Sequence, residues 1–109
     1  MLAHKRLDVY RCALEFLAVA VKVAMPRGYA ALGDPLRRAA LSIPLNIAFA
    51  VGKPADDRAR FFGIARGSAM ECSAIVDGCL LIGAMNEQEA EKAEALLERI
   101  VAMLTRLCR

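Results

Sequence analysis

Residues 36–50 read LRRAALSIPLNIAFA, and this stretch places apolar side chains on two opposite sides of one helix. Residues spaced three and four apart form one face, which we expect to point into the protein: Leu36, Ala39, Ala40, Ile43 and Ile47. A second apolar line, formed by Leu41, Leu45 and Phe49, follows the opposite side. Pro44 lacks the N–H for one backbone hydrogen bond and predicts a kink in this helix.

Proline and glycine divide the chain into four helical segments, and no segment has the alternation typical of a strand. We expect helices over residues 7–25, 35–51, 57–84 and 87–108. The second helix opens at Asp34-Pro35, where a carboxylate is expected at the N-cap and proline at the first helical position. The fourth opens at Asn86 with Glu89 three residues later, which is a capping-box pattern.

The third and fourth segments carry apolar seams in alternating steps of three and four residues, the packing line of a left-handed helix pair. The expected seam of the third segment is Phe61, Ala65, Ser68, Cys72, Ile75, Cys79 and Ile82. That of the fourth is Ala90, Ala93, Leu97, Ile100, Leu104 and Leu107. Small residues in the third segment, including Gly63 and Gly67, would allow close approach of a neighbour. Short loops then predict a single all-α domain, residues 1–109, folded as an antiparallel up-down-up-down four-helix bundle.

The first helix is apolar around most of its circumference. Its charges, at Asp8, Arg11, Glu15 and Lys22, fall within about 60° of arc. Such a helix must be buried nearly all round, whereas one bundle covers only about half of each helix. The first and second helices therefore predict a homo-oligomer, with Leu41, Leu45 and Phe49 at the interface. The alternative is a monomer with scattered surface leucines.

The composition excludes several classes of function. The chain has 109 residues and a single His, at position 4, so a His-based metal centre lacks its ligands and His-dependent catalysis is not expected. Ser42 and Ser68 have no His or Lys within helical reach, and GYAALG at residues 28–33 lacks the spacing of a phosphate loop. We expect no metal, no cofactor and no enzymatic activity.

The four cysteines, Cys12, Cys72, Cys79 and Cys108, form no CxxC pair and all fall within expected helices. They are expected to be reduced and buried. The sequence shows no cleavable signal and no stretch apolar enough for a membrane, so we expect a cytoplasmic protein without a membrane partner.

The charge is uneven along the chain: residues 1–66 carry a net charge of +6 and residues 67–109 a net charge of −3. In the expected bundle one end collects seven basic residues against three acidic ones, and the other end has a net charge of −1. The basic residues of the first end are Lys5, Arg6, Lys53, Arg58, Arg60, Arg106 and Arg109. A ring would multiply this charge and attract RNA or DNA backbones without reading sequence. Alternatively, these residues complement helix dipoles and keep the protein in solution.

Two further predictions concern side-chain contacts. Phe61 and Phe62 are the only aromatic residues among these basic ones in the sequence, and we expect them to lie partly in the core, so base stacking is not indicated. Arg37 or Arg38 is expected to form a structural ion pair with Glu71, either between the second and third helices or between adjacent subunits.

Residues 36–48, LRRAALSIPLNIA, resemble the LRRAxxSIPxNIAEG signature of the bacterial ribosomal-RNA intervening-sequence proteins. This family also includes the accessory variability determinant of diversity-generating retroelements. LDVY at residues 7–10 and FFGIARGSAME at residues 61–71 agree with it as well. The chain departs from the signature where Phe49 and Ala50 replace its glutamate and glycine, so a role of that glutamate does not carry over.

The resemblance implies a four-helix bundle in a ring-shaped homopentamer. For the retroelement members it also implies binding of a reverse transcriptase and of nucleic acid. Our leading hypothesis is therefore a non-enzymatic oligomer that presents its basic end to nucleic acid or to a nucleic-acid-bound protein. The alternative is a purely structural or protein–protein interaction bundle.

Overall fold

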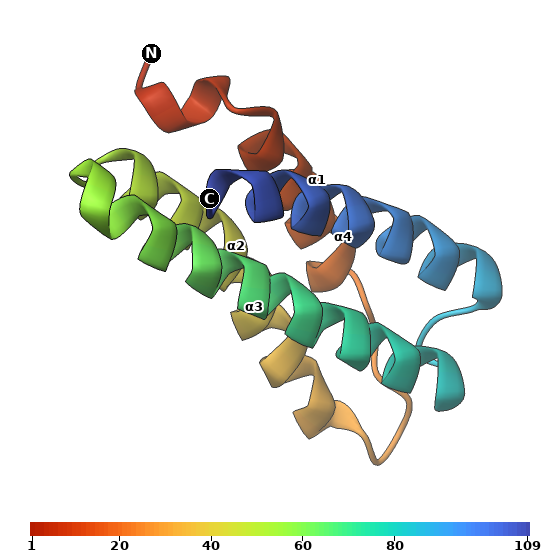
Figure 1. Cartoon of the computed structure of the whole chain (residues 1–109). Coiled ribbons are helices and arrows are strands. Elements are labelled where there is room, and N and C mark those ends of the chain that lie inside the picture. The colour runs from red at the N-terminus through yellow and green to blue at the C-terminus, as the bar shows by residue number, and fades with distance from the viewer.

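The computed structural model describes all of residues 1–109 and contains four α-helices and two short 3-10 helices (Figure 1). The α-helices are α1 (Asp8–Val21), α2 (Gly33–Val51), α3 (Ala55–Leu81) and α4 (Glu87–Leu107), and the 3-10 helices are η1 (Ala3–Arg6) and η2 (Ala30–Leu32). Each α-helix contacts its neighbours in the order α1–α2–α3–α4, and α4 also contacts α1. The four helices thus enclose one core, in a molecule measuring 45 × 25 × 23 Å. None of them combines the length and the apolar character that crossing a membrane requires.

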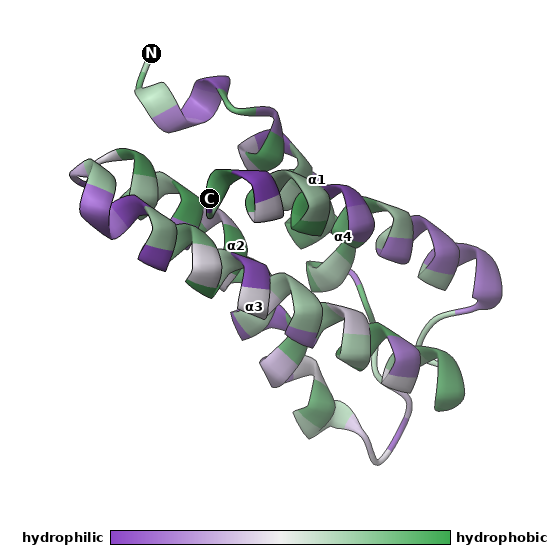
Figure 2. Ribbon diagram, in the orientation of Figure 1, coloured by the Kyte–Doolittle hydropathy of each residue, from purple (hydrophilic) through white to green (hydrophobic).

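The core consists of 24 buried hydrophobic residues, drawn from all four α-helices and, at Met85, from the loop between α3 and α4, and it includes no buried polar or charged residue. The inward face expected for α2 is confirmed, because Leu36, Ala39, Ala40, Ile43 and Ile47 are all buried. In α4 the expected seam is buried from Ala90 to Leu104, whereas Leu107, in its last turn, is 38% exposed. Figure 2 shows hydrophilic residues along the visible side of α4, as its amphipathic sequence predicts.

The seam expected for α3 is wrong at several positions. The buried residues are Phe62, Ala65, Ala69, Cys72, Val76 and Cys79. Phe61, Ser68, Ile75 and Ile82 are only partly buried, because α3 packs between α2 and α4 and these residues lie on the side nearer α2. Gly63 and Gly67 are exposed and face no neighbour within the chain, contrary to their expected role in close helix packing.

Two helices end earlier than expected. α1 ends at Val21 rather than Met25, since the residue before Pro26 is disfavoured in the helical region and β-branched Val23 adds little helix propensity. α3 ends at Leu81 because Gly83 adopts a positive φ of 81°. The N–H groups of Gly83 and Ala84 then bond to the carbonyls of Leu80 and Cys79, which is a Schellman motif.

Of the two helix N-caps predicted from the sequence, one is confirmed and one is wrong. The capping box of α4 is confirmed: the Glu89 N–H donates to Asn86 Oδ1 at 2.7 Å, and the Asn86 N–H donates to Glu89 Oε1 at 2.9 Å. The N-cap expected at Asp34 is wrong, because η2 runs directly into α2 and the helix begins at Gly33. Asp34 instead accepts a hydrogen bond from Arg37 at 2.8 Å. α2 continues through Pro44 without interruption.

All four cysteines are free thiols. Cys12, Cys72 and Cys79 are buried as expected, and Cys108, just after α4, is only partly buried. Burial raises the pKa of the Cys72 thiol to about 12, with a smaller contribution from the neighbouring Glu71 carboxylate, and burial also raises the pKa of Cys79. Because the thiolate is the reactive form, these two thiols are chemically quiet at neutral pH.

Candidate nucleic-acid interface

Three parts of the chain lie toward one end of the molecule in Figure 1: the N-terminal segment, the loop between α2 and α3 with the first turns of α3, and the C-terminal end of α4. The 3-10 helix η1 holds the N-terminal segment against α2. These parts carry the seven basic residues singled out in the sequence, and every one of them is exposed: Lys5, Arg6, Lys53, Arg58, Arg60, Arg106 and Arg109. We call these residues the basic end.

No residue of the basic end has a carboxylate partner. The chain contains two salt bridges, Arg11–Asp8 at 3.4 Å and Arg37–Asp34 at 2.8 Å, and neither involves the basic end. Arg58 donates from Nε to the Lys53 carbonyl at 2.9 Å, which orders this side chain and leaves its charge uncompensated by an ion pair. The basic end therefore presents unpaired cations to the solvent, as phosphate binding requires.

Two phenylalanines adjoin the basic end. Phe49 and Phe61 make an edge-to-face pair, with ring centroids 6.3 Å apart. Lys53 Nζ lies 5.5 Å from the centroid of the Phe61 ring, and Arg60 Cζ lies 5.6 Å from it. Phe62 is buried and Phe61 partly buried, as expected, whereas Phe49 is 54% exposed. Sequence reasoning missed this cluster, although Phe49 and Phe61 lie within two turns of the loop that joins α2 and α3.

The outer apolar line of α2 is uncovered in the single chain. Leu41 and Leu45 are each 46% exposed, and Phe49 is 54% exposed, while the opposite face of the same helix is fully buried. The structure thus confirms that this line faces outward, and its role as a subunit interface stays a prediction. Leu14 and Val21 of α1 are also exposed, at 41% and 50%.

Ser42 and Asn46 lie on the side of α2 that faces α3. Ser42 Oγ and Ser68 Oγ are hydrogen-bonded at 2.8 Å, and Asn46 Nδ2 donates to both the Ser42 hydroxyl and the Ser42 carbonyl. Ser42 therefore connects α2 to α3, and Asn46, one turn later on α2, holds the Ser42 hydroxyl in place, which gives their spacing a physical reason. The family profile described as 23S rRNA-intervening sequence protein matches residues 5–106.

The chain belongs to the 23S rRNA-intervening sequence protein family. The match covers nearly the whole chain, including all four α-helices except the last residue of α4. Among curated proteins, none matches this chain.

In this member of the intervening-sequence family, the expected ion pair with Glu71 does not form within the chain. Arg37 pairs with Asp34, three residues earlier on the same helix, a spacing that brings opposite charges together on a helix surface. Arg38 and Glu71 both line a cleft of about 280 Å³ between α2 and α3, beside Ser42 and Ser68, but no salt bridge joins them. Both residues are exposed, so water solvates their charges. A pairing between subunits stays a prediction.

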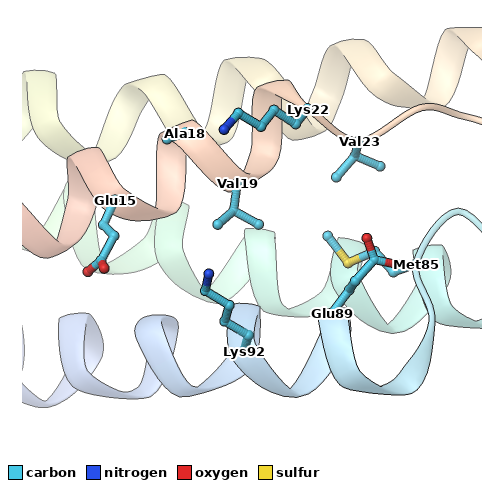
Figure 3. Close-up of a pocket in the computed structure, with 8 residues that line it drawn as sticks. All are labelled: Glu15, Ala18, Val19, Lys22, Val23, Met85, Glu89 and Lys92. Atoms are coloured by element: carbon cyan, nitrogen blue, oxygen red, sulfur yellow. The ribbon is translucent and has the colours of Figure 1, made fainter.

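A second cleft of this intervening-sequence protein, of about 330 Å³, lies between α1 and α4 (Figure 3). It is lined by Glu15 of α1, by Lys22 just after α1, and by Glu89 and Lys92 of α4, over apolar side chains that include Val19. No salt bridge joins these four charged groups. Across the whole chain, no group of three or more His, Cys, Asp or Glu residues is placed to hold a metal ion.

Proposed function

We propose that this intervening-sequence protein is a non-enzymatic, cytoplasmic homo-oligomer that binds RNA or DNA, or a nucleic-acid-bound protein, through its basic end. The observation that supports the proposal most is the exposure of all seven basic side chains without a carboxylate partner. Phosphate contacts of this kind give affinity without sequence readout and release counterions from the nucleic acid.

The assembly in this proposal is a ring of bundles with up-down-up-down helices. The hydrogen bonds between Ser42 and Ser68, and between Ser73 and Glu94, support that helix order, as does the short loop between α2 and α3. The exposed line of Leu41, Leu45 and Phe49 supports the subunit contact. Five copies is the number that the family resemblance implies, and five basic ends facing one way would carry a charge of about +20.

A salt series tests the binding. Fluorescence anisotropy with labelled mixed-sequence RNA and DNA would be measured from about 50 to 200 mM salt. We expect a slope of log K against log salt of about −4 or steeper, since each phosphate contact with a DNA duplex contributes about −0.9. The Arg106→Glu/Arg109→Glu variant should bind at least tenfold more weakly.

The matched control is Lys22→Glu/Arg27→Glu, which makes the same change of charge outside the basic end and should retain most of the affinity. Equal losses in both variants would show that net charge alone drives binding. Absence of binding to either nucleic acid at low salt would refute the nucleic-acid function. The second candidate would then hold: a structural or protein-binding bundle, which the exposed line on α2 favours.

A further inference from the structure

Both aromatic pairs of the chain lie beside residues of the basic end. Phe49 and Phe61 form the first pair, on either side of the loop between α2 and α3. His4 and Tyr10 form the second, with ring centroids 4.8 Å apart, in the N-terminal segment and the first turn of α1. A surface that combines exposed cations with aromatic rings is suited to single-stranded nucleic acid, because the cations contact phosphates and the rings stack on bases.

Phe49 is the most open of these four rings, since it is 54% exposed and the other three are partly buried. Lys53 Nζ and Arg60 Cζ lie over the Phe61 ring, whereas no cation lies over Phe49. The edge-to-face contact with Phe61, with the ring planes 70° apart, orients the Phe49 ring. Phe49 thus offers an oriented aromatic surface next to two cations. The sequence alone did not indicate stacking, because Phe61 and Phe62 adjoin the basic residues along the chain and Phe49 joins them only in the fold.

The net charge around this aromatic pair is small. Residues 53–60 carry three exposed basic side chains and two exposed acidic ones, Asp56 and Asp57, so their net charge is +1. The two carboxylates lie in the first turn of α3, where the helix dipole favours them, and they weaken the attraction for phosphates. Phosphate contacts alone would therefore hold a nucleic acid weakly at this part of the basic end. A base stacked on Phe49 would add affinity that does not depend on charge.

We propose that the Phe49 ring stacks on an unpaired base of single-stranded RNA or DNA while Lys53 and Arg60 contact the phosphates beside that base. The basic end then prefers single strands to duplexes. In a duplex each base is paired and stacked between its neighbours, so no base face reaches the ring and only the backbone is offered. The inference rests on the nucleic-acid binding proposed above and names the class of nucleic acid that is bound.

Phe49 also ends the outer line of α2, so base stacking and the proposed subunit contact meet at this residue. Leu45 and Leu41 lie one and two turns further from the loop between α2 and α3. Phe49 therefore occupies the rim of the proposed subunit contact, where the outer line reaches the basic end. Rim residues of an interface stay accessible to solvent, which leaves ring surface for a base.

Fluorescence anisotropy tests this preference with a labelled unstructured oligopyrimidine, as RNA and as DNA, and with the blunt duplex that each forms with its complement. The wild type should bind each strand more tightly than its duplex. Phe49→Leu removes the ring and keeps an apolar side chain, so it should weaken strand binding about tenfold, the effect of losing one stacked base. Duplex binding and the salt slope should not change, because no charge is altered. Arg60→Gln should instead make the salt slope for the strand shallower by about 0.7, the share of one phosphate contact.

The matched control is Tyr29→Leu, the same kind of change at an aromatic residue that is 44% exposed in the loop between α1 and α2, outside the basic end. It should leave strand binding intact, and Phe49→Tyr, which keeps a ring, should retain it too. Circular dichroism and sedimentation check that each variant has the helices and the mass of the wild type. Equal affinity for strand and duplex, or an unchanged preference in Phe49→Leu, would overturn this inference alone. Absence of binding to every probe at low salt would refute the nucleic-acid function itself.

Discussion

α4 and α2 differ in how much of their sequence a single chain explains. α4 buries its seam from Ala90 to Leu104, exposes most of its charged residues and begins at a complete capping box. α2 buries its inward face equally well, yet it leaves Leu41, Leu45 and Phe49 about half exposed. Folding of one chain accounts for the apolar residues of α4. It does not account for those on the outer line of α2, which the proposed subunit contact would cover.

The largest expected effect is on the free energy of unfolding, and it distinguishes the buried side of α2 from the exposed side. Ile43 is fully buried, so Ile43→Ala should lower the free energy of unfolding by about 2–5 kcal/mol through lost burial and the cavity left behind. Leu45→Ala, at a position 46% exposed, should cost an isolated chain much less. Urea unfolding at a low protein concentration measures both. Equal costs at the two positions would contradict the assignment of an inner and an outer side.

The next effect concerns assembly. Phe49→Glu places a charge on the exposed line of α2 and should weaken self-association at least tenfold, because the charge would have to be desolvated in the interface. Light scattering measures the mass at several concentrations. Ala95→Glu, at an exposed position on α4, is the control and should leave the mass unchanged. A Phe49→Glu variant that assembles normally would refute the interface role of this line.

The burial of Cys72 predicts a loss of stability at high pH. Because the pKa of this thiol is raised to about 12, the folded chain holds the proton more tightly than the unfolded chain does. The resulting stability is therefore present at neutral pH and is lost as the pH rises above about 9, by up to about 1.4 kcal/mol per pH unit. Urea unfolding between about pH 8 and 11 should show a shallower decline in Cys72→Ala than in Cys108→Ala. Identical slopes would contradict the prediction.

The smallest expected effects are losses of stability from substitutions at the starts of α4 and α2. Asn86→Ala removes the cap of α4 and should cost about 1 kcal/mol. Asp34→Ala removes only an exposed ion pair with Arg37 and should cost less than about 0.5 kcal/mol, because Asp34 lies inside α2 and caps nothing. Thermal unfolding of the two variants checks the order. A larger loss for Asp34→Ala would restore the N-cap that its position before proline suggests.

Local patterns in the sequence predicted part of this structure well. The inward face of α2 and the capping box at Asn86 depend on spacing within one helix, and both are confirmed. The seam of α3 was misplaced because α3 shares its core side between two neighbouring helices, which spacing alone does not locate. Neither Arg37 nor Arg38 pairs with Glu71 within the chain, since long side chains take their partners from the folded surroundings, and a pairing between subunits stays a prediction. The buried Glu94 Oε2, which has no hydrogen-bond partner, has no signal in the sequence, because it depends on contacts between α3 and α4.

The claim that α2 carries a surface for contact beyond the chain is tested most directly by the mass of the wild-type protein in solution. Sedimentation equilibrium at micromolar concentration gives this mass independently of shape. The account predicts a multiple of the 11.8 kDa chain, with five copies if the ring implied by the family resemblance forms. A mass of 11.8 kDa at every concentration would contradict it, and the exposed line on α2 would then have to be explained by a different partner.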